Sequence, residues 1–204
     1  MNVRQMNRLT AHMDRYLGQE CEGVLHPVID NGYHVDVLVY RPSEKNPFWK
    51  LVTMGASDYL MPPLTPTLGR RNEYIMTVDG EEKLDDAEVR GWFVNKLLGI
   101  VFYAYSQGVH LSYGHSLEWT NEDDGDEMVG AFLEMPQFIP DAGVLHCRLG
   151  LLRRTTLLQA VLLTRSDLDR LAEIGPAAFS EFLYPEEEGA PRHFLSERRR
   201  SERF

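Results

Sequence analysis

Residues 74–108 read YIMTVDGEEKLDDAEVRGWFVNKLLGIVFYAYSQG and carry the two patterns that decide the fold. Tyr74, Met76 and Val78 alternate with their neighbours in steps of two, which predicts a strand that ends at Asp79-Gly80. The rest of the stretch predicts a long helix over 86–106.

This predicted helix has clear ends and a wide apolar surface. Asp85 is its expected N-cap, Glu88 three positions later completes a capping-box-like start, and Gly108 is a suitable terminator. Apolar side chains cover most of its circumference: Trp92, Phe93, Leu97, Leu98, Ile100, Phe102 and Tyr103. A helix of this kind is usually buried against a sheet.

Outward from this predicted strand and helix, the same periodicities predict the other strands and helices. Strands are expected at 34–40, 49–53, 128–135, 143–147 and 155–163, and an extended segment at 110–119. Helices are expected at 3–17, 164–174 and 177–183, the last two separated by Gly175-Pro176. Strands and helices do not alternate strictly, so the sequence predicts an α+β fold with a central mixed or antiparallel sheet and flanking helices. We expect one domain over 1–185 and a charged C-terminal tail over 186–204.

Composition excludes several classes of partner. The 204 residues carry a net charge of −10, which argues against a general binder of nucleic acid or anionic membrane. Cys21 and Cys147 allow at most one disulfide and form no zinc knot. The chain start lacks the apolar core of a signal peptide, and no apolar run reaches the ~20 residues of a membrane span. We therefore expect a cytoplasmic protein with reduced thiols, no membrane association and no cofactor.

No known catalytic signature is present, so an enzyme would depend on weaker clusters. His34 and Asp36 share one face of their predicted strand and suit an acid/base couple or a polar surface stripe. His110 and His115, with Glu118 nearby, suit a metal site only if Gly114 bends the chain, because positions 110 and 115 otherwise face opposite sides.

Three further polar segments each have a simpler structural interpretation. Ser57 is the nearest candidate for a nucleophile, but a turn or cap role explains it equally well. Arg71 and Glu73 share a strand face and would bind an extended peptide or each other. The acidic turn 121–127 lacks the glutamate that completes an EF-hand loop, so we interpret it as a solvated loop. We expect Arg198–Arg200 to form a solvated tail.

Six short blocks resemble the N-terminal half of the suppressor-of-fused domain, in that family's order. They are GYHVDV (32–37), LVTMGASD (51–58), RNEYIMT (71–77), GHSL (114–117), LEMPQF (133–138) and TLLQAVLLTRSDLDRL (156–171). Each block is short, but their ordered succession over about residues 30–185 is specific.

The resemblance implies an α+β fold with a central mixed sheet, in agreement with the periodicities. The animal family member is a two-domain negative regulator of Hedgehog signalling that clamps an extended peptide of Gli transcription factors as an added strand. The present chain has no room for the second domain, so Gli-type binding does not carry over.

A stand-alone domain of this size resembles the bacterial members, some of which are assigned as immunity proteins of polymorphic toxin systems. The leading hypothesis is therefore a non-enzymatic module that binds, and sequesters or inhibits, a protein partner such as a toxin domain or an extended peptide. An acidic inhibitor would be steered quickly to a basic toxin. The candidate partner-binding residues are the polar positions of the family-like blocks: His34, Asp36, Ser57, Asp58, Arg71, Glu73 and His115. The rival hypothesis is an enzyme or metal-binding protein that uses His34/Asp36 or His110/His115.

Overall fold

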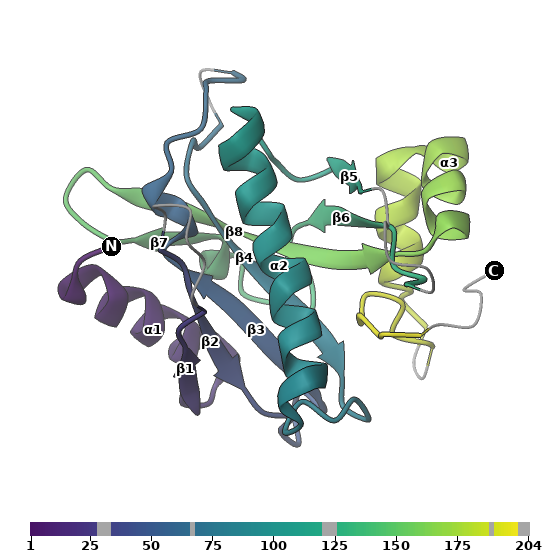
Figure 1. Cartoon of the computed structure of the whole chain (residues 1–204), viewed down its shortest axis with the longest axis horizontal. Helices are drawn as coiled ribbons and strands as arrows, with labels where there is room; N and C mark the ends of the chain where they lie inside the picture. Colours follow the sequence, from purple (N-terminus) through teal and green to yellow (C-terminus); the bar gives the residue numbers. More distant parts are fainter. Residues whose placement is uncertain (28–33, 66–67, 120–125, 188–189, 200–204) are drawn as a thin grey trace.

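The computed structural model describes residues 1–27, 34–65, 68–119, 126–187 and 190–199 (Figure 1). The strands are β1 (Gly23–Leu25), β2 (Asp36–Tyr40), β3 (Phe48–Met54), β4 (Asn72–Asp79), β5 (Ser116–Glu118), β6 (Gly130–Glu134), β7 (His146–Arg148) and β8 (Arg154–Leu163). The helices are α1 (Val3–Leu17), α2 (Ala87–Gln107) and α3 (Arg165–Leu183), with short 3-10 turns η1 (Ala56–Asp58) and η2 (Ala142–Leu145). The predicted α+β fold with a central mixed sheet and flanking helices is confirmed.

The eight strands of the described residues all belong to one sheet. Their order is β1-β2-β3-β4-β8-β6-β5, and β7 forms a second pair with β8. The β4–β8 pair is parallel, whereas the other pairs are antiparallel. Two strands from distant parts of the chain therefore lie side by side at the centre of the sheet.

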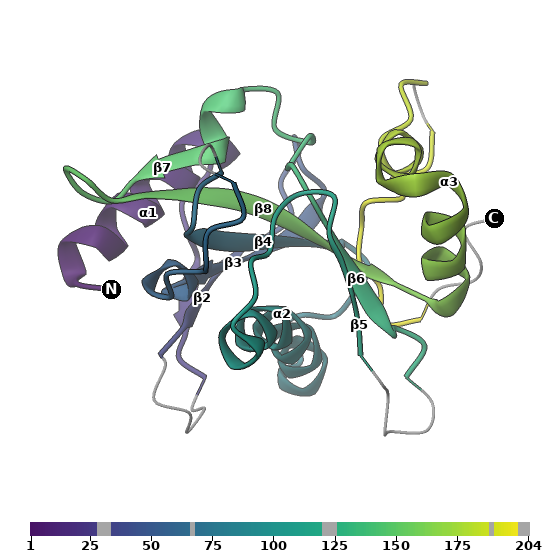
Figure 2. The same ribbon diagram turned by 90° about the horizontal axis from the view of Figure 1, so that it is seen from above.

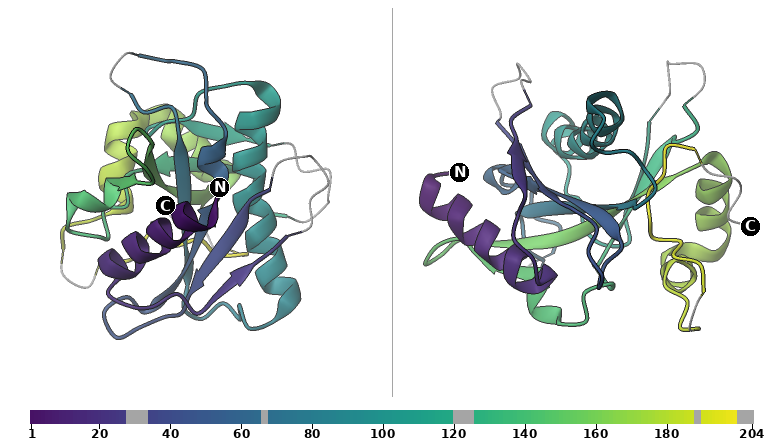
Figure 3. Two further views of the ribbon diagram at one scale, coloured as in Figure 1. Left: turned by 90° about the vertical axis from the view of Figure 1, so that its left-hand side faces the viewer. Right: turned by 90° about the horizontal axis from the view of Figure 1, so that it is seen from below.

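The three helices cover both faces of the sheet. α2 packs on one face, and α1 and α3 pack on the opposite face at its two ends (Figures 2 and 3). In β2, Val37 and Val39 belong to the α2 side, whereas Leu38 and Tyr40 belong to the α1 side. Because the central strands are buried on both faces, their sequences are nearly continuous apolar runs.

The start of α2 differs from the prediction by one residue. The N-cap is Asp86, whose carboxylate accepts hydrogen bonds from the N–H groups of Glu88 and Val89. Asp85 instead forms a bidentate pair with the guanidinium of Arg41, at 2.6 and 3.1 Å. Either of the two adjacent aspartates could serve as the N-cap on sequence grounds. Arg41 engages Asp85, which leaves Asp86 as the cap.

Several short elements also differ from the prediction. The strand expected at 143–147 is wrong over its first part, because Ala142–Leu145 form η2 and β7 begins at His146. The Asp141 carboxylate caps this turn by accepting from the N–H of Gly143. Of the extended segment 110–119, Ser116–Glu118 pair as a strand, and β1 was not predicted.

The two predicted C-terminal helices form α3, which is interrupted at Gly175 with φ of 80°. This break lies at the predicted Gly175-Pro176 step. The acidic turn 121–127 falls mostly outside the described residues. Within it, Asp126 forms an ion pair with Lys96.

The segment after α3 packs onto the sheet. Phe194 and Leu195 are buried, and Ser196 forms a parallel bridge with Val78 where β8 no longer pairs with β4. The Ser196 N–H donates to the Thr77 carbonyl at 2.8 Å. This part of the expected tail therefore contributes to the core and is not a solvated extension.

No helix among the described residues is both long and apolar enough to cross a lipid bilayer. Cys21 and Cys147 are both free thiols, so the single disulfide that the sequence allowed is not formed.

Candidate functional site

The turn after β3 is held by the buried carboxylate of Glu73 on β4. Its Oε1 accepts from the N–H groups of Gly55 and Ser57, both at 3.1 Å. Its Oε2 accepts from the Thr53 hydroxyl at 2.7 Å and the Ala56 N–H at 3.2 Å. Burial raises the pKa of Glu73, whereas these hydrogen bonds favour its ionised form. Glu73 therefore fixes the start of η1.

The end of the β3–β4 ladder makes room for this carboxylate. The last paired residues are Val52 and Ile75, after which β3 continues against β2 alone. The Thr53 hydroxyl then accepts from the Tyr74 N–H at 2.8 Å. Gly55 turns the chain with φ of 125°, and a Cβ there would lie 2.7 Å from the His34 carbonyl oxygen, so this position requires glycine.

The other end of η1 is held by two arginines. Arg71 donates to the carbonyl oxygens of Ser57 and Asp58 at 2.6 and 3.0 Å. Arg153 donates to the Ser57 carbonyl at 3.0 Å and pairs with the Asp58 carboxylate. Anionic Glu73 at the N–H end and cationic groups at the carbonyl end complement the dipole of the turn. Arg71 and Glu73 thus hold one segment from opposite ends.

Asp58 connects this network to two surface elements. Its carboxylate contacts the amino group of Met1, just before α1, and the guanidinium of Arg153, at the start of β8. Burial would raise the pKa of Asp58, but these two cations hold it below its usual value. The predicted residues Ser57, Asp58, Arg71 and Glu73 therefore lie together and tie α1 to the β7–β8 hairpin.

A basic groove of about 940 Å³ lies between these two elements. We define it by α1, β7 and the hairpin residues Leu149–Leu151, which lie beside each other in Figure 2. Among the described residues, those that line it include no aspartate or glutamate and six that are basic or titrate to cations: Arg4, Arg8, Arg15, Arg148, His12 and His146.

The arginines of the basic groove are available to a ligand. Arg8 donates to the Leu149 carbonyl at 3.0 Å and links the two walls. Arg4, Arg15 and Arg148 are exposed, and no acidic side chain of the described ranges forms an ion pair with them. The groove therefore presents unneutralised positive charge on a chain of net charge −10.

The hairpin tip beside the groove is apolar and exposed. Leu151 and Leu152 are 89% and 96% exposed, the two largest values among the exposed large apolar residues. Adjacent, fully exposed leucines beside a cationic groove favour a ligand that combines acidic and apolar groups.

Cys147 lines the groove but is a poor nucleophile. Burial and the nearby charge of Glu73 raise the pKa of Cys147 to about 11. The thiolate, which is the reactive form, is then scarce near neutral pH. This part of the groove suits binding better than nucleophilic catalysis.

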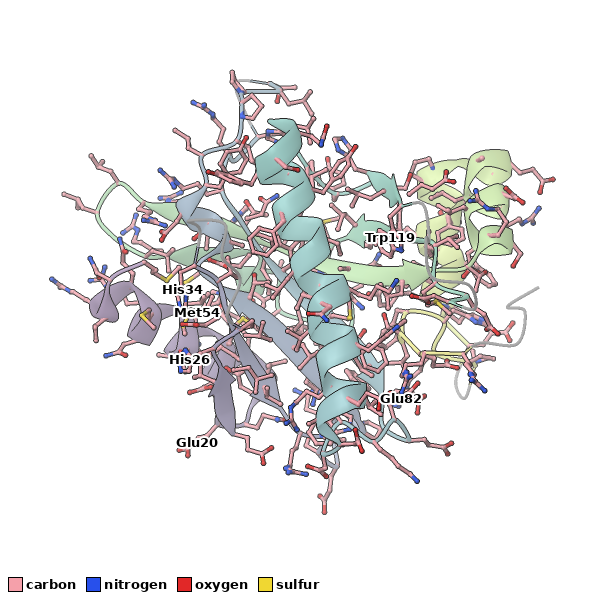
Figure 4. All side chains as sticks on the ribbon, in the orientation of Figure 1. Glu20, His26, His34, Met54, Glu82 and Trp119 are labelled. Carbon is pink, nitrogen blue, oxygen red and sulfur yellow. The ribbon has the colours of Figure 1, made fainter. Side chains whose placement is uncertain are left out.

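His34 and Asp36 form a second cluster, together with His26. One oxygen of Asp36, Oδ1, lies 2.8 Å from His26 Nδ1 and 2.7 Å from His34 Nε2. Figure 4 places both imidazoles near Met54, which is paired with Asp36 across β2 and β3. The expected shared face of His34 and Asp36 is therefore present, with His26 as an added member.

The remaining histidines lie elsewhere. His115 precedes β5, the last strand at the opposite edge of the sheet from β1. His110 is nearly buried, with Nδ1 2.9 Å from the Pro62 carbonyl oxygen. Within the described ranges, His110 and His115 do not come together with a third metal-ligating side chain. The seven candidates thus divide into the η1 network, the His34–Asp36 pair and the separate His115.

Sequence reasoning missed the groove and His26. Arg4, Arg8 and Arg15 recur on one side of an amphipathic helix, and this spacing was visible in the sequence. Nothing in the sequence indicates that Arg148 and Arg153 face that helix. The predicted strand at 143–147 ends before Arg148, whereas β7 includes it. His26 follows a strand of three residues, which is too short to be recognised by periodicity.

The comparisons with known proteins identify the family. The family model described as Suppressor of fused protein (SUFU) matches residues 31–199. A comparison with curated protein sequences finds no match.

Three solved structures share the fold at low identity. A chain of the Sufu–Fu complex crystal structure aligns with a TM-score of 0.67 and 12% identity, over 97% of this chain and 91% of that chain. A protein described as a SUFU homologue from Neisseria gonorrhoeae FA 1090 aligns at 0.65 and 9%, over 98% and 97%. Drosophila Suppressor of Fused aligns at 0.60 and 13%, over 96% of this chain but 50% of its own length. The match of the family model to most of the sequence, on this fold, shows that the chain belongs to the suppressor of fused family.

Proposed function

We propose that this chain is a non-enzymatic protein-binding module that holds an acidic segment of a partner in the basic groove. The observation that carries the proposal is a set of four arginines, Arg4, Arg8, Arg15 and Arg148, in a groove that no acidic residue of the described part of the chain lines. Charge complementarity at such a surface supplies specificity and speeds association. Leu151 and Leu152 at its rim would bind apolar side chains of the same segment.

Family membership supports a protein as the ligand. One of the aligned structures is a complex of Sufu with Fu, so a member of this fold is known to bind a protein. The high pKa of the Cys147 thiol argues against a covalent enzyme in this groove.

The predicted site residues take a supporting role in this proposal. Glu73 and Ser57 are fully buried, so they would act on a partner through the turn that they hold. Asp58, through Arg153 and Met1, would keep the two walls of the groove at a fixed separation. Contacts of His34, Asp36 and His115 with a partner stay a prediction.

The finer role that we propose is inhibition of the partner, as an immunity protein inhibits its toxin in the cytoplasm. Cytoplasmic conditions would keep Cys21 and Cys147 reduced. The net charge of −10 favours a toxin that is basic overall, whereas the groove selects an acidic segment on it. The negative net charge of this chain would then attract the basic toxin over long range, whereas the positive groove would recognise an acidic segment on contact.

Charge reversal in the groove tests the proposal. We expect Arg4→Glu/Arg15→Glu to retain a partner captured from the native lysate at least about tenfold less than the wild type, because two cation–anion contacts become repulsive. Quantitative mass spectrometry of proteins eluted from the tagged chain measures this loss. The amount of partner that the wild-type chain retains should also fall as the salt concentration rises.

Lys45→Glu is the matched control, since Lys45 is an exposed cation outside the groove. It should retain the partner at the wild-type level. Equal retention of every captured protein by wild type and Arg4→Glu/Arg15→Glu would refute the groove as the binding surface. For the immunity role, wild type should relieve the toxicity of the captured partner on co-expression, and the groove variant should not.

A further inference from the structure

The hairpin of β1 and β2 brings three potential metal ligands to one face of the sheet. In the β1–β2 register Leu25 pairs with Val37, so the next residue, His26, comes opposite Asp36. His34 precedes Asp36 by two residues and therefore points to the same side. The three ligand atoms, His26 Nδ1, His34 Nε2 and Asp36 Oδ1, all lie within 4.8 Å of one another.

The three groups differ in burial in a way that suits an ion arriving from solvent. The Asp36 side chain is 4% exposed, whereas those of His26 and His34 are 66% and 69% exposed. A buried carboxylate thus forms the base, and two exposed imidazoles form the rim. Both rings converge on the same oxygen, which concentrates three ligands around one point.

We propose that His26, His34 and Asp36 bind a divalent transition metal ion, with Zn²⁺ as the best match to two nitrogens and one carboxylate oxygen. Zn²⁺ accepts imidazole nitrogen and carboxylate oxygen at about 2.0–2.2 Å, and water completes a four-coordinate site. In a tetrahedral site with metal–ligand bonds of this length, neighbouring ligand atoms lie about 3.3 Å apart. The present N–O separations of 2.7 and 2.8 Å must therefore open by roughly half an ångström. The exposed imidazoles can make this movement without disturbing the core.

The ion would join β1 to β2 beyond the end of their short ladder. β1 has only three residues and forms an edge of the sheet, so few main-chain hydrogen bonds hold it. Binding to the folded hairpin would stabilise the protein by mass action. None of His26, His34 and Asp36 lines the basic groove, so the site does not depend on the proposed groove function.

Titration of the metal-free protein tests the site. The protein is dialysed against a chelator and titrated with ZnCl₂ by calorimetry, and with CoCl₂ by visible absorption. We expect one ion per chain, the absorption bands of four-coordinate Co²⁺, and a higher Tm with Zn²⁺. His26→Gln and His34→Gln should each weaken binding by at least about 100-fold, since even groups outside the ligand set contribute 10–100-fold.

His193→Gln is the matched control, because His193 stacks on Phe182 beside α3, far from this hairpin in the chain. It should bind zinc as the wild type does. The exposed positions of His26 and His34 allow both variants to fold, which circular dichroism checks. Absence of saturable one-to-one binding, or equal affinity in wild type and both histidine variants, would overturn the proposal.

Discussion

Glu73→Gln is expected to lower the free energy of unfolding by about 1–3 kcal/mol, which is a sizeable part of the stability of a single domain. Each carboxylate oxygen of Glu73 accepts two hydrogen bonds from η1 or Thr53. Glutamine has one oxygen, so in either orientation its NH₂ group faces at least one buried N–H donor, that of Ala56 or those of Gly55 and Ser57. The Thr53 hydroxyl can turn to accept from the NH₂ group. An unsatisfied buried donor costs about 1–3 kcal/mol.

Urea unfolding followed by circular dichroism measures this loss. Glu20→Gln makes the same chemical change at an exposed position and should alter the free energy of unfolding by less than about 0.5 kcal/mol. A loss below about 1 kcal/mol for Glu73→Gln would contradict the role given to this carboxylate.

The second large effect is a rise in stability with pH that depends on Lys50. This side chain is fully buried, and its Nζ donates to the carbonyl oxygens of Arg41 and Asn46 at 2.9 and 3.2 Å and to Gln19 Oε1 at 3.3 Å. All three acceptors are uncharged, and burial lowers the pKa of Lys50 to about 8.

The direction of the effect follows from proton binding. Between pH 8 and the unfolded pKa of about 10.4, the unfolded chain holds a proton that the folded chain has lost. The free energy of unfolding therefore rises with pH in this window, by about 2 kcal/mol from pH 7.5 to 9.5 and about 3 kcal/mol in total.

Other groups also contribute to the pH dependence, among them Cys147, whose thiol titrates in this range only in the unfolded chain, so the measurement is a difference. Unfolding of wild type and Lys50→Met is followed over pH 7–10. The wild-type value should rise relative to Lys50→Met by the stated amount. Parallel pH profiles of the two proteins would show that Lys50 does not lose its proton in the folded state.

The long elements of the fold were predictable because their patterns are strong. β4 and α2 follow from the two-residue spacing of Tyr74, Met76 and Val78 and from the broad apolar surface of 92–103, and tertiary contacts only adjusted the cap from Asp85 to Asp86. Short elements were not predictable. β1 has three residues, and η2 contains Val144 and Leu145, whose β-branched and apolar side chains suggest a strand.

The candidate site was predictable only in part. The sequence predicts one binding surface from seven residues, and Ser57, Asp58, Arg71 and Glu73 of that set converge. His34 and Asp36 pair elsewhere, and His115 lies near the opposite edge of the sheet. The hydrogen bonds of Arg71 and Glu73 to main-chain atoms of η1 could not be foreseen, since these depend on where the β3–β4 ladder ends. The positive groove was hidden by the net charge of −10, which averages over the whole chain.

The parallel β4–β8 pair also has a consequence for how the chain reaches its native state. β4 leaves its edge open until β8, which follows α2, β5, β6 and β7 in the chain, has been synthesised. Such a non-local pairing requires a long loop to close, and the chain loses this conformational entropy before the stabilising contacts form. Folding is slower as a result. During translation, the β2–β4 meander would emerge first with an unpaired apolar edge strand, an interval in which strand-to-strand aggregation competes with folding. Residues 194–196, which extend the pairing of β4, would close that interval only after α3 has also been synthesised.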